Sequence, residues 1–148
     1  MAVAAAPAFG DAHRALIASR QSRGDQLGAV ALAQAVATRF DTSAEALVAL
    51  GHACAAAYRT KDALWAFERA LQMEERPDAA MAAGTLYRRL GDAATAGARF
   101  ARAYAAGAGP EALRENARAL KSAGDHLAAQ QAIDLWVKET GLKWEEKG

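Results

Sequence analysis

The sequence has little of what would indicate a disulfide, a metal cluster or a nucleic-acid surface. Cys54 is its only cysteine, so no intrachain disulfide can form and no cysteine-based metal cluster can be assembled. The 18 basic and 17 acidic side chains leave a formal net charge of +1, which gives no electrostatic basis for binding nucleic acid. We therefore expect any charge preference to be local. We expect Cys54 itself to be a small, buried apolar residue.

The N-terminal residues are not expected to form a targeting or membrane-spanning segment. Residues 1–10 are rich in alanine but lack a basic region, and their apolar run is very short. They fit neither a secretory signal nor a membrane span, so we expect a flexible N-terminal tail over 1–10 on a cytoplasmic protein without membrane insertion. The hydrophobic fraction is 53% and consists largely of alanine, which favours helix but adds little side-chain area to a core.

No motif for catalysis or cofactor binding is present in the sequence. His13, His52 and His126 fall in separate predicted helices, with no second histidine at metal-ligand spacing. The sequence also has no nucleophile motif centred on serine or cysteine and no phosphate-binding glycine loop. We therefore expect a protein that is not an enzyme and that uses no cofactor or metal ion.

What the sequence does contain is an internal repeat with a period of 33 residues. The same residue types recur at the same offsets in two segments, namely Leu50, Gly51, Cys54, Ala63, Phe67 and Ala70, and then Ala83, Gly84, Tyr87, Ala96, Phe100 and Ala103. A close copy follows from Pro110, and a more degenerate copy precedes, as terminal repeats often are. The predicted repeats cover about 10–43, 44–76, 77–109 and 110–140.

This pattern resembles the tetratricopeptide repeat (TPR), whose unit is a helix, a turn and a second helix. The resemblance covers roughly residues 10–140. It implies an all-α fold, an α-solenoid of about four antiparallel helical hairpins in a right-handed superhelix. The predicted helices are 11–22, 26–40, 43–58, 61–74, 77–90, 93–107, 110–122 and 126–140.

Residues typical of helix ends support these boundaries. We expect Asp11 to cap the first helix, and Thr42 with Glu45 to form a capping box before the third. Tyr58 and Arg59 stand where the other repeats have Gly-Asp, so we expect this turn to come later, near Thr60. Inside the hairpins we expect glycines to approach alanines closely while phenylalanines fill the space between hairpins. These residues are Gly51 with Ala63, Gly84 with Ala96, and then Phe67 and Phe100.

The resemblance implies a concave groove that binds a protein or peptide, lined by the first helix of each hairpin. The residues expected to face it are Val48, His52, Met81, Thr85, Arg88, Arg89, Arg114, Arg118 and Lys121. The last five form what we call the basic cluster, which favours an acidic segment as ligand. The alternative is an ordinary solvated helix face on which Glu115 pairs with Arg118 or Arg114. The carboxylate clamp of TPR domains that hold chaperone C-termini is not matched, since its positions hold Arg14, Ala18, Ala49, Asp78 and Ala82.

The C-terminal end of a repeat array needs a polar outer face or a cap. Residues 141–148 could supply a lid, because Gly141 stops the last helix and leaves Leu142 and Trp144 free to fold back over its outer edge beside Trp136. Two alternatives remain open. Residues 141–148 could be a disordered tail, or the three side chains could form a terminal interface for a partner subunit, including a homodimer through this edge.

The resemblance to TPR proteins covers nearly the whole chain but does not identify a partner. A protein-interaction scaffold or adaptor is the function that we expect. The alternatives are a secretion or assembly chaperone of the TPR type and a self-associating structural scaffold. The alanine-rich composition is typical of high-GC bacteria, which keeps the chaperone alternative open and favours a free-standing bacterial protein.

Overall fold

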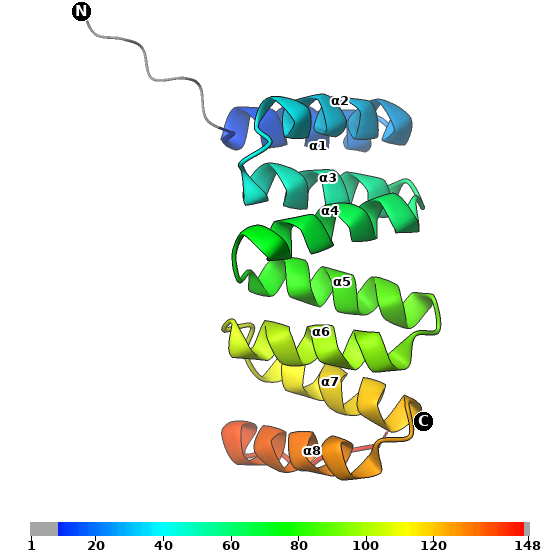
Figure 1. Ribbon diagram of the computed structural model, residues 1–148, viewed down its shortest axis with the longest axis vertical. Helices are drawn as coiled ribbons and strands as arrows, with labels where there is room; N and C mark the ends of the chain where they lie inside the picture. The colour runs from blue at the N-terminus through cyan, green and yellow to red at the C-terminus, as the bar shows by residue number, and fades with distance from the viewer. Residues whose placement is uncertain (1–8, 147–148) are drawn as a thin grey trace, which may run out of the picture. The chain divides into compact units, whose positions relative to one another are not determined.

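The computed structural model describes residues 9–146, and its regular structure is entirely helical (Figure 1). The helices in this range are α1 (Asp11–Ser22), α2 (Gln26–Arg39), α3 (Ala44–Ala56), α4 (Thr60–Met73), α5 (Pro77–Arg89), α6 (Ala93–Ala105), α7 (Pro110–Ser122) and α8 (His126–Thr140). The predicted all-α fold is confirmed, and each predicted helix agrees with these bounds to within two residues at either end. The predicted N-terminal tail falls, over residues 1–8, outside the described residues.

The chain divides into two compact units, residues 1–74 with α1 to α4 and residues 75–148 with α5 to α8. Within each, consecutive helices pack against one another in chain order as antiparallel neighbours (Figure 1). Each unit therefore consists of two helical hairpins, as the repeat predicts. A right-handed superhelix over all four hairpins stays a prediction.

Two helical glycines make room for a phenylalanine of the second helix in the same hairpin. A Cβ added at Gly51 would lie 2.6 Å from Phe67 Cε1, and one at Gly84 would lie 2.7 Å from Phe100 Cε1. Both rings are fully buried. The close approach predicted at these glycines is present, but the group nearest to each is the phenylalanine ring and not the alanine side chain. Phe100 also packs against Ala119 of α7, so it joins two hairpins within unit 2.

The turn inside each hairpin has the same geometry in all four repeats. In α1–α2, α5–α6 and α7–α8 a glycine takes a positive φ, and the amide of the following aspartate donates to a carbonyl five residues earlier. In α3–α4, Tyr58 takes that position with φ +59°, and the Arg59 amide donates to Cys54 O at 2.8 Å. The prediction of a later turn near Thr60 was therefore wrong. A non-glycine residue in this conformation is strained, and the turn keeps its register despite that strain.

Two predicted caps were wrong by one residue. The N-cap of α1 is Gly10, whose amide donates to His13 Nδ1 at 3.2 Å, and Asp11 is the first helical residue. The N-cap of α3 is Ser43, whose Oγ accepts from the Ala46 amide at 3.2 Å. Serine and threonine are comparable caps, so the pair Thr42-Ser43 left the choice open to tertiary packing.

Candidate binding surface

Helix α7 presents three members of the basic cluster on one side. Arg114, Arg118 and Lys121 follow one another at spacings of four and three residues, which places them on the same helical face. About 37% to 45% of each side chain is exposed. The helix that positions them begins with Pro110 at its first turn and Glu111 beside the positive end of its dipole. The cations are therefore accessible, but they are held on a rigid element.

All three of these cations have an acidic partner in unit 2. Glu115 pairs with Arg118 at 3.4 Å and with Arg88, which reaches it from α5. Arg114 lies 3.9 Å from Glu111. The local pairing considered from the sequence is therefore present at Arg118, whereas Arg114 pairs one turn earlier along the helix. Glu115 is only 12% exposed, and a carboxylate at that depth requires cationic partners to offset its lost hydration.

The remaining predicted groove residues of unit 2 lie on α5. Thr85 donates its hydroxyl to Met81 O at 3.0 Å, so this hydroxyl is engaged within the helix. Met81 is half-buried and packs against the Phe100 cluster. Arg89 is exposed at the C-terminal end of α5. Arg88 also lies over the Phe100 ring, with its guanidinium carbon 5.6 Å from the ring centroid. Of the predicted groove residues on α5, the structure brings only Arg88 together with those on α7.

The predicted groove residues of unit 1 are arranged differently. Val48 is 7% exposed, so its assignment to an open groove was wrong. Its side chain belongs to the buried core. His52 is exposed, and its ring packs edge-on against Phe67 with centroids 5.0 Å apart. Cys54 is buried as predicted, and burial, with the nearby charge of Asp62 as a smaller cause, raises the pKa of its thiol.

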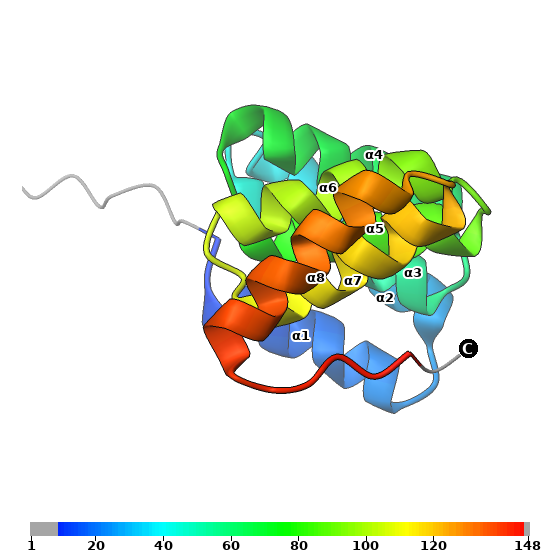
Figure 2. The same cartoon turned by 90° about the horizontal axis from the view of Figure 1, so that it is seen from below.

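After α8 the chain turns back and runs alongside the α7–α8 hairpin (Figure 2), and it packs on both helices. Trp144 packs against Ala117, Ala132 and Ile133, and its ring meets Trp136 at 88° with centroids 5.3 Å apart. Leu142 remains 60% exposed. The predicted fold-back of Trp144 beside Trp136 is therefore present, with Ala117 of α7 as a further contact, whereas Leu142 does not take part in it.

The outer edge of α8 is closed by polar residues instead. Gln130, Gln131, Asp134 and Lys138 are all exposed, and the exposed apolar side chains of α8 are Leu127 at 74% and Val137 at 37%. A polar outer face is one of the two ways in which a terminal repeat avoids a sticky end. The tail is consequently not required as a cap, which leaves its position over α7 to be explained.

Two cavities flank the tail where it crosses the hairpin. One of about 410 Å³ is lined by Ala117, Arg118, Lys121, Ser122, Ile133, Trp144, Glu145 and Glu146. The other, of about 370 Å³, is lined by Arg114, Trp136, Leu142, Lys143, Trp144 and Glu145. We call this surface, with the residues of α7 and α8 that line it, the α7–α8 groove. It combines an apolar floor with cations at its rim.

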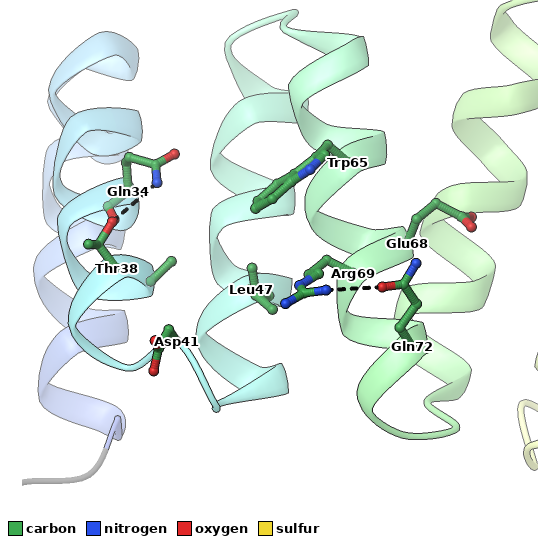
Figure 3. Close-up of a pocket in the computed structure, with 9 residues that line it drawn as sticks. Gln34, Thr38, Asp41, Leu47, Trp65, Glu68, Arg69 and Gln72 are labelled. Carbon is green, nitrogen blue, oxygen red and sulfur yellow. Dashed lines mark hydrogen bonds between the residues drawn. The ribbon is translucent and has the colours of Figure 1, made fainter.

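Unit 1 has a hollow of its own, which the sequence did not predict (Figure 3). It measures about 480 Å³ and is lined by Trp65 and Arg69 of α4 and by Gln34 and Thr38 of α2, with Leu47 of α3 beside Arg69. Trp65 is 59% exposed. This exposure could have been predicted from the sequence, because Trp65 stands two residues before the core residue Phe67 and therefore lies on a different face of the helix. An exposed tryptophan beside a hollow is a typical feature of interaction surfaces.

The described residues contain no group of three histidine, cysteine, aspartate or glutamate side chains arranged to hold a metal ion. Within residues 9–146, none of the helices combines the length and apolar character needed to cross a membrane. The longest of them, α8, has 15 residues.

Comparison with known proteins gives matches among solved structures. No protein-family model matches the sequence, and no curated protein matches it. The crystal structure of MamA has a TM-score of 0.75 at 18% identity, over 90% of this chain and 77% of that one. YrrB, described as a TPR protein with an unusual peptide-binding site, gives 0.72 at 19% identity, over 87% and 68%. PcrH, in complex with the chaperone binding region of PopD, gives 0.61 at 22% identity, over 80% and 90%. At these identities the likeness is one of fold.

Proposed function

We infer that this chain, which has the fold of the tetratricopeptide-repeat superfamily, is a non-catalytic interaction module that binds an acidic segment of a partner protein. The observation that carries this proposal is the exposed cationic face of α7, where Lys121 already holds a carboxylate, that of Glu146. Arginine and lysine side chains that remain more than a third exposed can exchange one carboxylate for another at little cost in hydration.

The similar structures support a peptide as the kind of ligand. YrrB is described as having a peptide-binding site, and PcrH was crystallised with a region of another protein. Neither identifies the partner of this chain. The likeness to PcrH also keeps an assembly chaperone as the alternative role, and the identity of the bound segment would distinguish a chaperone from an adaptor.

The proposal is tested with a random peptide library displayed on phage and selected on the full chain. We expect the enriched peptides to be rich in aspartate and glutamate, with affinities that fall as salt is added, because exposed charges are screened over about 10 Å at 0.1 M. Replacing Arg114 and Arg118 together with glutamine should weaken an enriched peptide by up to about thirtyfold, since each exposed ion pair contributes at most about 1 kcal/mol.

A double variant of Arg23 and Arg39, also to glutamine, is the matched control. Both residues are exposed in unit 1, so the change in net charge is the same while the α7 face stays intact. Helical content is measured by circular dichroism for every variant. Enriched peptides without acidic residues, or equal losses of affinity in the two double variants, would refute the proposal.

A further inference from the structure

The tail follows α7 in register. Arg114 of α7 lines one cavity together with Lys143, Ala117 belongs to the cluster on which Trp144 packs, and Lys121 pairs with Glu146. The tail therefore runs parallel to α7. A rise of about 1.5 Å per helical residue separates Arg114 from Lys121 by roughly 10 Å. An extended chain covers a similar span in about four residues. This is how an extended peptide would lie along a helical face.

The tail matches the groove in chemistry as well as in length. The Trp144 ring fills the apolar floor between Ala117 and Ile133, and the Glu146 carboxylate pairs with Lys121 at the rim. Glu145 lines the cavities on both sides of the tail. An aromatic anchor between apolar walls and an acidic group on a cation are the two kinds of contact that dominate peptide recognition.

The fit is incomplete in a way that favours exchange. Trp144 Nε1 is buried but has no hydrogen-bond acceptor among the described residues. A buried donor without a partner opposes the docked state. The pair between Lys121 and Glu146 leaves 45% and 58% of the two side chains exposed, and pairs of that kind contribute little. A ligand that supplied an acceptor to this floor would compete well with the tail.

We propose that residues 143–146 act as a built-in ligand of the α7–α8 groove, and that this groove binds in trans an extended peptide with an aromatic residue followed by acidic residues, which displaces the tail. The proposal rests on the proposed function and narrows it, because it names the aromatic anchor as well as the charge. It also assigns the tail a regulatory role, since a groove that is covered in cis is available only to a peptide that outcompetes residues 143–146.

The probe is a synthetic peptide with the sequence of residues 141–148, Gly-Leu-Lys-Trp-Glu-Glu-Lys-Gly, labelled at its N-terminus and followed by fluorescence anisotropy up to millimolar protein. The full chain is compared with a vacated variant, Trp144→Ala/Glu146→Ala. If the tail covers the groove in more than nine-tenths of molecules, the vacated variant should bind at least about tenfold more tightly. Glu146→Ala alone, which keeps the aromatic anchor, should give a smaller gain.

Leu127→Ala is the matched control, because it removes an α8 side chain that is 74% exposed and lines neither cavity, and it should leave affinity unchanged. A charge exchange then tests the register. In the vacated variant, Lys121→Glu should weaken the peptide, and a peptide with lysine in the place of Glu146 should recover that loss. Equal affinity of the full chain and the vacated variant, or no recovery by the exchanged peptide, would overturn the proposal. Circular dichroism and urea unfolding establish that each variant is folded.

A hexaglutamate peptide, which keeps the charge without the ring, separates this proposal from the proposed function. If hexaglutamate binds the full chain and the vacated variant equally and in a salt-sensitive way while the tail peptide shows no preference, the built-in ligand is refuted and the acidic-segment module stands. If neither peptide binds any variant, both fail. The oligomeric state of the full chain and of the vacated variant is measured in parallel by sedimentation. If the full chain is a dimer and the vacated variant is a monomer, the tail is exchanged between copies, which would overturn its role in cis.

Discussion

Gly84→Ala should destabilise unit 2 even though alanine is the better helix former. In an open helix this change would stabilise by about 1 kcal/mol. Here the new Cβ would lie 2.7, 2.8 and 3.0 Å from Phe100 Cε1, Cδ1 and Cζ. The ring is fully buried and packs against Ala96 and Ala119, so it has no space into which to retreat. Overpacking costs about 1–3 kcal/mol, and contacts this short against a buried ring place Gly84→Ala in the upper half of that range, at about 2–3 kcal/mol. After the gain in helix propensity we expect a net loss of about 1–2 kcal/mol.

Gly97→Ala provides the matched control, because this glycine also lies inside a helix of unit 2. Its added Cβ would meet Leu120 Cδ2 at 3.5 Å and Ala119 Cβ at 3.6 Å, which are ordinary contacts. We expect this variant to gain about 0.5–1 kcal/mol from helix propensity. The two glycine-to-alanine changes should therefore differ in sign.

Urea unfolding followed by the fluorescence of Trp136 and Trp144, both in unit 2, measures these free energies. The slope of each transition should not change between variants. Combining Gly84→Ala with Phe100→Leu should cost less than the sum of the two changes, by about 1 kcal/mol, because the shorter side chain removes the overlapping ring edge. If Gly84→Ala were as stable as Gly97→Ala, the close packing of glycine on the phenylalanine ring would not describe this hairpin.

Two further predictions concern the turns and caps. Tyr58→Gly should raise stability by about 1 kcal/mol, because Tyr58 is 91% exposed with φ +59° and glycine removes the strain of that conformation. Ala57→Gly is the control and should not raise stability, because Ala57 has φ −90°. Thermal unfolding of both variants measures the difference. Asp92 caps α6, and its hydrogen bonds to Thr95 hold the pKa of its carboxyl below the ordinary value of 3.8; the stabilisation is present above that value and lost as the pH falls through the folded-state pKa. The Tm advantage of the wild type over Asp92→Ala should thus be present at neutral pH and narrow at acid pH, and an unchanged difference would contradict the cap.

The fold could be predicted from the sequence because its determinants are local and repeated. The Gly-Asp turns, the prolines at the first turns of α5 and α7, and the 33-residue spacing each specify a hairpin without long-range information. The misplaced turn at Tyr58 shows the limit of this reasoning. Residue preference argued for a later turn, whereas the packing of α3 on α4 held the register and imposed a positive φ on tyrosine.

The candidate site could be predicted less completely, because it depends on distances that no repeat encodes. Helical spacing was enough to place Arg114, Arg118 and Lys121 on one face. It could not show that Arg88 reaches Glu115 across 27 positions of sequence, nor that Lys121 meets Glu146 across 25. The sequence indicated that Trp144 folds back, but the surface on which it comes to rest depends on which face of the last hairpin is apolar and unfilled.

The polar outer face of α8 has a consequence for how this end of the molecule moves. Helix α8 packs mainly on α7, with Tyr104 of α6 donating a hydrogen bond to Glu139 near its end, so fewer contacts oppose its detachment than oppose that of α6 or α7. Local openings of this kind determine how fast backbone amides exchange with deuterium. The tail bridges α7 and α8 through Trp144, and it therefore slows such opening as long as it stays docked. The deuterium uptake of α8 thus becomes a label-free measure of whether the tail is docked, which can be followed in the unmodified chain.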